Sequence, residues 1–249
     1  MKIYYPLLSR TMLKKRVLVE IQAMLRDSNE QFEDQGCRID QMYIFWDPDN
    51  IGNLRVIIIP IETCYQNTVY EFSVSLDKYP MKPPTVIVEN TGSRRTHPNF
   101  YARSNGGKVC LSILGTWAGP SDHGWTPTCT LPSLFRTILL TLQTDNPLSC
   151  EPSYGSISVG DPNNVAYCDA ARYLSLDMTL AWYKTAFKDS NPFMASIARR
   201  LYVEHREFYI SHSSREDATV NRSIHGQVDI KYSTFGRRIE ELDAIIEDN

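Results

Sequence analysis

The sequence predicts an α+β fold in which one helix precedes a four-stranded antiparallel meander, and a long loop then leads into further helices. Three observations support this prediction. Apolar residues recur at helical spacing near the start of the chain and again in its last part, whereas the stretch between them is organised as short strand-like segments. A segment of about forty residues that is rich in Gly, Pro and Ser separates the two kinds of pattern. Strands that follow one another before the later helices begin are typical of this fold class.

The first helix is predicted over residues 8–27. Its apolar stripe consists of Leu13, Val17, Ile21 and Leu25, which recur every four residues. Its other face is basic, with Arg10, Lys14, Lys15, Arg16 and Arg26. The simplest interpretation of such a charge run is a solvated face. Residues 28–36 are predicted to be a polar connector.

Four segments rich in Val, Ile, Tyr and Phe follow, and each is predicted to be a strand. They are Met42 to Asp47, Leu54 to Ile61, Val69 to Leu76, and Thr85 to Val88. In the third segment apolar and polar residues alternate, as in a strand with one buried face. The short links between the segments predict an antiparallel meander.

The chain from Asn90 to Thr130 shows little periodicity, and loops this long in compact domains are usually functional or disordered. It contains cysteine, histidine and tryptophan, so we expect a functional loop. A helix is then predicted after Thr130, its N-cap candidate. Further helices are predicted over residues 163–187 with a break near Leu176, over residues 193–209, and over residues 235–246. Residues 211–234 are expected to be a mobile connector.

Composition excludes several classes of protein. The net charge of −3 excludes a broadly basic nucleic-acid binder, and 42% hydrophobic residues exclude a disordered chain. The longest apolar run, residues 56–59, is too short to span a membrane. No two of the six cysteines have the close spacing of a zinc or redox motif. We therefore expect an intracellular protein without a metal site, a disulfide framework, or a nucleic-acid or membrane partner.

A series of short motifs carries a specific resemblance. In order, they are YPMKPP (residues 79–84), HPN (97–99), GKVCLSILGTW (107–117), W-x-P at Trp125 and Pro127, and the turn at residues 145–147. Together they resemble the core of the ubiquitin-conjugating enzymes over roughly residues 8–185. The long loop after Cys110 and the helical C-terminal part are similar to the large members of that family. The resemblance implies a conjugating core over residues 8–187 and a helical extension over residues 188–249.

The resemblance also implies the chemistry. Cys110 would accept ubiquitin or a related modifier as a thioester from an activating enzyme and pass it to a substrate lysine, usually with a ligase. It assigns Asn99 to stabilising the oxyanion or to holding the loop. It makes His97, Pro98 and Tyr79 structural residues near the site. No cofactor is expected to be bound, since ATP is consumed by the activating enzyme.

Two surfaces are implied for partners. The family uses the first helix to meet the activating enzyme, which points to Lys14, Lys15 and Arg16. It uses the W-x-P loop to meet ligases, which points to Pro127 and Thr128. The cytoplasm, the nucleus or both are the expected locations, because the short basic run does not define a nuclear signal.

One position departs from the family pattern. Many members place an acidic residue two positions after the Asn-Pro turn, where it orients the attacking lysine, but this chain has Ser149 there and Glu151 two residues later. Either Glu151 fills the role, which we favour, or catalysis depends on desolvation and the ligase. The departure leaves open a catalytically weak, ubiquitin-binding or scaffold module. A hydrolase using Cys110 is weaker, since no clear Cys–His pair is visible.

Overall fold

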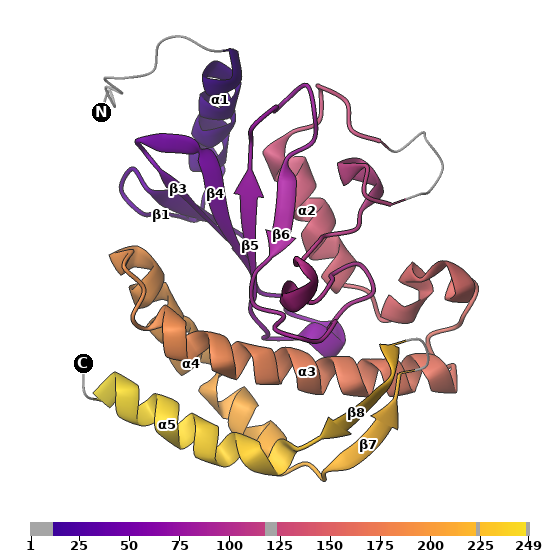
Figure 1. Ribbon diagram of the computed structural model, residues 1–249. Coiled ribbons are helices and arrows are strands. Elements are labelled where there is room, and N and C mark those ends of the chain that lie inside the picture. The colour runs from indigo at the N-terminus through magenta and orange to yellow at the C-terminus, as the bar shows by residue number, and fades with distance from the viewer. Residues whose placement is uncertain (1–11, 118–123, 223–224, 248–249) are drawn as a thin grey trace.

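The computed structural model describes residues 12–117, 124–222 and 225–247 and confirms the predicted α+β fold (Figure 1). Its helices are α1 (Met12–Arg26), α2 (Leu131–Leu142), α3 (Pro162–Ala186), α4 (Pro192–Ser213) and α5 (Phe235–Glu247). Its strands are β1 (Glu30–Gln31), β2 (Gly36–Ile39), β3 (Met42–Asp47), β4 (Asn50–Ile58), β5 (Tyr70–Ser75), β6 (Thr85–Val88), β7 (Ala218–Asn221) and β8 (Gln227–Ile230). The start of the first predicted helix, residues 8–11, lies outside the described residues.

The meander has six strands in the order β1 to β6, not the four that the sequence predicted. The two additional strands lie at or beside the expected polar connector and pair through Glu30 with Arg38 and Gln31 with Cys37. Strands this short carry no readable alternation. Gly36 lets β2 pass close to β3, because a Cβ there would lie 2.6 Å from the carbonyl oxygen of Ile44.

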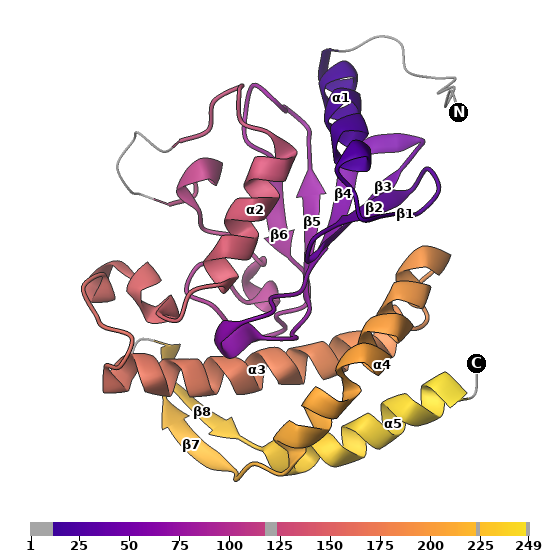
Figure 2. The same ribbon diagram turned by 180° about the vertical axis from the view of Figure 1, so that it is seen from behind.

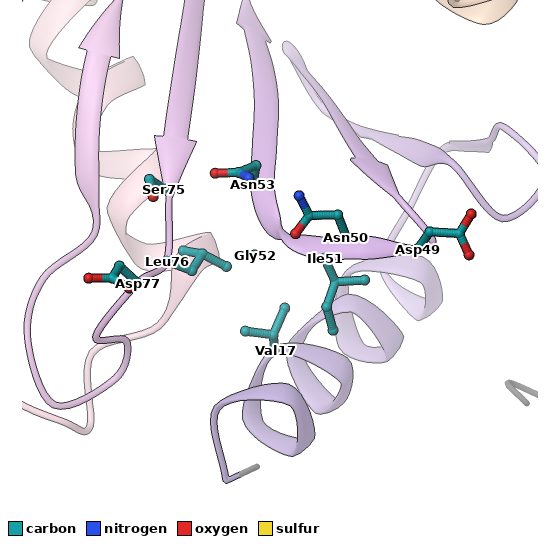
Figure 3. Close-up of a pocket in the computed structure, with 9 residues that line it drawn as sticks. All are labelled: Val17, Asp49, Asn50, Ile51, Gly52, Asn53, Ser75, Leu76 and Asp77. Atoms are coloured by element: carbon teal, nitrogen blue, oxygen red, sulfur yellow. The ribbon is translucent and has the colours of Figure 1, made fainter. Parts of the chain in front are cut away.

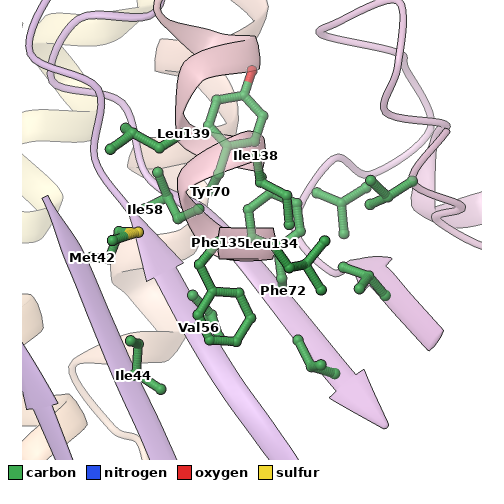
Figure 4. Close-up of a cluster of buried hydrophobic side chains, with 14 of the residues drawn as sticks. Met42, Ile44, Val56, Ile58, Tyr70, Phe72, Leu134, Phe135, Ile138 and Leu139 are labelled. Carbon is green, nitrogen blue, oxygen red and sulfur yellow. The ribbon is translucent and has the colours of Figure 1, made fainter. Parts of the chain in front are cut away.

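Both faces of the sheet are apolar and covered. On one face α1 and α2 pack over the strands, and Figure 4 shows Phe135 and Ile138 of α2 against Val56 and Phe72. On the other face, side chains such as Tyr43 pack with α3, α4 and α5. Strand β3 therefore points alternate side chains into two different cores, which is why it reads as a continuous apolar run.

Helix α3 runs without interruption beneath the sheet, and β7, β8 and α5 lie on its far side (Figures 1 and 2). The predicted break near Leu176 is wrong. Polar residues interrupt the apolar pattern there, but each has a buried partner. The hydroxyl of Ser175 lies 2.9 Å from that of Tyr70, and the hydroxyl of Thr179 accepts the backbone N–H of Val69 at 2.8 Å.

The segment 211–234, expected to be a mobile connector, instead contains an antiparallel hairpin formed by β7 and β8. In β8, Val228 and Ile230 are buried and alternate with exposed residues. Gly226 occupies the left-handed region with a φ of 73° just before β8. The two strands are too short for the sequence pattern to distinguish them from a loop. The hairpin places Arg222 against the backbone of Arg95, and His225 against Glu151 and Tyr167.

Candidate active site

The loop that carries Cys110 is tied to the edge of the sheet. Val88 of β6 donates its N–H to the carbonyl of Gly107 at 2.8 Å, and Val109 forms an isolated bridge with Phe100. Gly107 has a φ of 62°, and a Cβ there would lie 2.3 Å from the carbonyl oxygen of Val88. Only glycine fits this close approach. The backbone just before Cys110 is therefore fixed against strand β6.

Asn99 and Cys110 are joined by reciprocal hydrogen bonds. The N–H of Cys110 donates to the carbonyl of Asn99 at 2.8 Å, and the side-chain amide of Asn99 donates to the carbonyl of Cys110 at 2.6 Å. The thiol of Cys110 donates to the carbonyl of Thr116 at 2.9 Å. The geometry thus brings together the predicted nucleophile and the predicted oxyanion residue, and adds Thr116, which the sequence did not single out.

Burial and nearby charges set the state of the thiol. Burial raises the pKa of Cys110, and the negative charge of Glu151 raises it further, whereas the positive charges of Lys108 and Arg95 lower it. Burial is the largest of these effects, so the thiol is mainly protonated near pH 7 in the free chain. A cavity of about 330 Å³ borders the loop, lined by Pro84, Ile87, Gly106, Lys108 and Thr116 among others.

His97 is fully buried and holds the turn before Cys110. Its Nδ1 accepts the N–H of Asn99 at 3.0 Å, and its ring lies 5.4 Å from that of Tyr65 and 5.0 Å from that of Phe100. Burial lowers the pKa of His97 to about 3, so the ring is neutral near pH 7. Arg95 donates to the carbonyl of Pro98 in the same turn. All these contacts of His97 and Pro98 are with groups that hold the turn in place.

Tyr79 belongs to a second buried arrangement, centred on the carboxylate of Glu20. The hydroxyl of Tyr79 donates to Glu20 Oε1 at 2.5 Å, and the N–H of Leu131 donates to Oε2 at 2.8 Å. Arg16 pairs with the same carboxylate and donates to the carbonyl of Cys129 at 3.2 Å. Arg16 thus joins α1 to the W-x-P loop and to the start of α2. From the sequence, Arg16 is expected on a solvated face or, by the resemblance, on a partner surface.

The other predicted partner residues are less enclosed. Lys15 is exposed on α1, whereas the side chain of Lys14 lies outside the described residues. Pro127 and Thr128 are exposed. Their loop is fixed by Trp125, whose ring N–H donates to the carbonyl of Pro80 at 2.7 Å.

A cavity of about 300 Å³ opens between α1 and the β3–β4 turn, and none of the candidate catalytic residues lines it (Figure 3).

Glu151 lies in an unforeseen cluster. Its Oε1 accepts a hydrogen bond from Arg95 at 3.2 Å and lies 3.2 Å from Nε2 of His225. Ser149, at the position where the family places an acid, donates its hydroxyl to the carbonyl of Asn146 at 2.7 Å. No sequence signal linked these residues, because Arg95 and His225 come from distant parts of the chain.

Neither a metal site nor a membrane-spanning helix is found in the described part of the chain. No group of His, Cys, Asp and Glu side chains there is arranged to hold a metal ion. No helix there has both the length and the apolar character needed to cross a membrane.

Comparisons with known proteins agree with the motifs. Residues 33–154 match the family model described as ubiquitin-conjugating enzyme. Over 173 residues, 68% of this chain and 52% of the relative, the chain is 31% identical to ubiquitin-conjugating enzyme E2 Z of Xenopus tropicalis. Over 119 residues, 46% of this chain and 16% of the relative, it is 34% identical to the probable ubiquitin-conjugating enzyme protein 17 of Caenorhabditis elegans. It thus spans about half or less of these relatives.

Among solved structures, the H. polymorpha ubiquitin conjugating enzyme Pex4p, crystallised with the soluble domain of Pex22p, aligns with a TM-score of 0.47 and 18% identity over 66% of this chain and 97% of that one. The sequence matches and the order of motifs around Cys110 carry the assignment. The chain belongs to the ubiquitin-conjugating enzyme family.

Proposed function

We propose that this chain is an active conjugating transferase that carries ubiquitin or a ubiquitin-like modifier as a thioester on Cys110. In this proposal residues 8–187 form the conjugating core and residues 188–249 the extension. One observation supports it above all. Cys110 lies on a fixed loop, and the side-chain amide of Asn99 donates to the backbone carbonyl of Cys110 itself. Any buried backbone carbonyl needs a partner, but here the partner is the side-chain amide that the resemblance assigns to the oxyanion, so the predicted donor lies beside the predicted nucleophile.

The first step is thiol exchange. Cys110 loses its proton, and the sulfur attacks the thioester carbonyl on the activating enzyme. A new C–S bond forms, the old one breaks, and the activating enzyme recovers its thiol. The two thioesters are close in energy, so the step needs access and a thiolate rather than a strong base. Binding of the activating enzyme must therefore offset the burial that raises the pKa of Cys110.

The second step is attack by a lysine amine. A C–N bond forms, the C–S bond breaks, Cys110 leaves as a thiolate, and the amine gives up a proton. The side-chain amide of Asn99 has two N–H donors, one of which is bound to the carbonyl of Cys110. The second N–H is the donor we assign to the oxyanion. A donor of this kind is worth about 10²–10³ in rate.

The proposal includes an activating enzyme that meets α1 at Lys15, a ligase that meets Pro127 and Thr128, and a substrate protein. Lys15, Pro127 and Thr128 are exposed, which supports these assignments. All six cysteines are free. A reactive thiol that must stay reduced suits a reducing compartment, the cytoplasm or the nucleus.

A charging assay tests the proposal. The chain is incubated with ubiquitin, an activating enzyme and ATP, and the products are separated with and without reductant. We expect an adduct of one ubiquitin mass that reductant removes. Cys110→Ala should abolish it, and Cys110→Ser should give a reductant-stable ester. Cys150→Ala is the matched control, because Cys150 is a half-buried thiol in the neighbouring segment. Charging of Cys110→Ala would refute the assignment.

The alternative is a catalytically weak module that binds ubiquitin or a ligase. Two observations favour it: Ser149 occupies the usual acid position, and the carboxylate of Glu151 already has partners. A parent chain that binds ubiquitin but never forms the reductant-sensitive adduct would establish this alternative. A hydrolase has less support, since the thiol of Cys110 donates to a backbone carbonyl and the neutral ring of His97 holds a turn.

A further inference from the structure

The turn of the hairpin in the extension contributes to a largely buried polar cluster, here called the Glu151 cluster. Its members are Arg95, Glu151, Tyr167, Arg222 and His225. Nε2 of His225 lies 3.2 Å from Oε1 of Glu151, and Nδ1 lies 3.2 Å from the hydroxyl of Tyr167. Arg95 donates to the same Oε1 at 3.2 Å. Segments far apart in the sequence therefore meet at one carboxylate.

The chemistry of the groups fixes the direction of each hydrogen bond. Burial, together with Arg95 and Arg222, lowers the pKa of His225 to about 3, so its ring is neutral near pH 7. A neutral ring has one N–H, and a carboxylate only accepts. Nε2 therefore donates to Glu151, and Nδ1 accepts from the hydroxyl of Tyr167. The side chain of His225 is 7% exposed, so water does little to loosen this arrangement.

Arg222 fastens the hairpin to the segment before the HPN motif. It donates to the carbonyl of Arg95 and, at 2.9 Å, to the carbonyl of His225. Its residue is 4% exposed. Burying a guanidinium is costly unless its donors are paired. Two of its nitrogens are paired, whereas Nε is buried without a hydrogen-bond partner among the described residues. The two bonds fix the hairpin to the backbone of Arg95.

The cluster reaches the candidate active site through Arg95. Its guanidinium donates to the carbonyl of Pro98, and its Cζ lies 4.2 Å from the ring centroid of Tyr101. Asn99 follows Pro98 and bonds to Cys110. The chain of contacts therefore runs from His225 through Glu151 and Arg95 to the turn beside the thiol.

We propose that Arg222 and His225 are positioning residues for the reaction of Cys110: the hairpin holds the Arg95–Glu151 ion pair beside the Pro98–Asn99 turn and so fixes the charges around the thiol. The inference deepens the proposed function, on which it rests for the role of Cys110. It makes the extension part of the active-site architecture.

The charges that act on Cys110 provide the readout. They are those of Lys108, Arg95 and Glu151, of which only Glu151 raises the pKa of the thiol. Glu151→Gln removes that charge and should move the midpoint of thiol ionisation downward. This shift depends on where the carboxylate is held. It should therefore shrink when His225 no longer fixes it.

The experiment measures the rate at which iodoacetamide alkylates Cys110 in the full chain between pH 6 and 10, with mass spectrometry of the Cys110 peptide separating it from the other thiols. The shift caused by Glu151→Gln is measured in the parent and in His225→Ala. We expect it to fall to less than half in His225→Ala and to recover in His225→Gln, whose amide replaces the Nε2 donor. Thr219→Ala is the matched control, since it removes the hydrogen bond from Thr219 to Asp229 in the same hairpin.

Each outcome decides the inference. Equal shifts in the parent and in His225→Ala, or no shift in the parent, would overturn it. If His225→Ala fails to fold, as judged by circular dichroism, Arg222→Lys takes its place with the same expectation. Alkylation needs no activating enzyme. A parent chain that shows the expected shifts but is never charged with ubiquitin would therefore refute the proposed function and leave the coupling standing.

Discussion

Asn99 and Cys110 hold each other: the side-chain amide of Asn99 donates to the carbonyl of Cys110 at 2.6 Å, and the N–H of Cys110 donates back to the carbonyl of Asn99 at 2.8 Å. One side chain therefore fixes the loop, and in the proposed function its second N–H serves a developing oxyanion. Loading tests only the position of the thiol, whereas lysine discharge tests both roles. The two roles of Asn99 can be separated by measuring both steps.

Asn99→Ala should slow lysine discharge by about 10²-fold, because it removes the oxyanion donor. It should also lower the free energy of unfolding by about 1–3 kcal/mol, because the carbonyl of Cys110 loses its partner. Loading should change only a few-fold. Single-turnover discharge of preloaded chain to free lysine, together with urea unfolding, measures these effects.

Asn164→Ala is the matched control for Asn99→Ala. Asn164 is also buried, and its side-chain amide donates to the carbonyls of Asp145 at 3.0 Å and Val159 at 2.9 Å. It should lose similar stability and keep the parent discharge rate. If both variants slow discharge equally, Asn99 acts through the fold alone.

Glu20 should be one of the most stabilising charged residues in the chain. Glu20→Ala would leave Arg16, the hydroxyl of Tyr79 and the N–H of Leu131 without their shared acceptor. We expect a loss of about 3 kcal/mol in the free energy of unfolding. Glu207→Ala, which removes an 85% exposed carboxylate from its pair with Arg206, should cost less than about 0.5 kcal/mol. Urea unfolding of both variants checks this, and equal losses would contradict it.

The order of helices and strands could be predicted because periodicity is a local property. The missed strands β1, β2, β7 and β8 are too short for their alternation to be read. The break predicted in α3 is wrong for another reason, which is that neighbours distant in sequence override the local pattern. Strand β3 has apolar side chains on both faces because the extension covers the second face. Helix α3 continues past Leu176 because Ser175 and Thr179 find buried partners in Tyr70 and Val69. No window of sequence contains these partners.

In the candidate site, too, local motifs could be predicted from the sequence, whereas contacts between distant segments could not. The HPN motif and the Cys110 loop could be predicted because their spacing is short and the family keeps their order. The Glu151 cluster could not, since Arg95, Glu151 and His225 meet only after the hairpin folds back onto the core. Arg16 shows a related difficulty. A basic residue on a helix face reads as solvated until a buried carboxylate is found beneath it.

Lys15 provides the test of the activating-enzyme surface. Of the three basic residues assigned to that surface, Arg16 has a structural partner, so charge reversal there would disturb the fold. Lys15 is exposed. Lys15→Glu should slow loading several-fold at low salt, an effect that fades as salt rises, because it acts on the encounter.

Discharge of preloaded Lys15→Glu should match the parent. Lys188→Glu, another exposed lysine reversed far from α1 in sequence, is the matched control and should load normally. Initial loading rates between 50 and 300 mM salt measure the effect. Unchanged loading of Lys15→Glu at low salt would show that Lys15 is a solvated residue that does not bind the activating enzyme.

His225 should make the stability of the chain depend on pH. Its pKa is lowered to about 3 in the folded chain, against about 6.5 in an unfolded one. Between these values the unfolded chain binds more protons, so the free energy of unfolding rises with pH and is lost on acidification below about 6.5. One such histidine contributes a slope of up to about 1.4 kcal/mol per pH unit. Because His225→Gln cannot titrate, it should reduce the slope between pH 6 and 5 by about 1 kcal/mol per unit, while the contribution of His97 remains in both chains.

Urea unfolding at steps of half a pH unit measures the slope. Thr219→Ala should leave it unchanged, and a parent-like slope in His225→Gln would show that the ring is already charged in the folded chain.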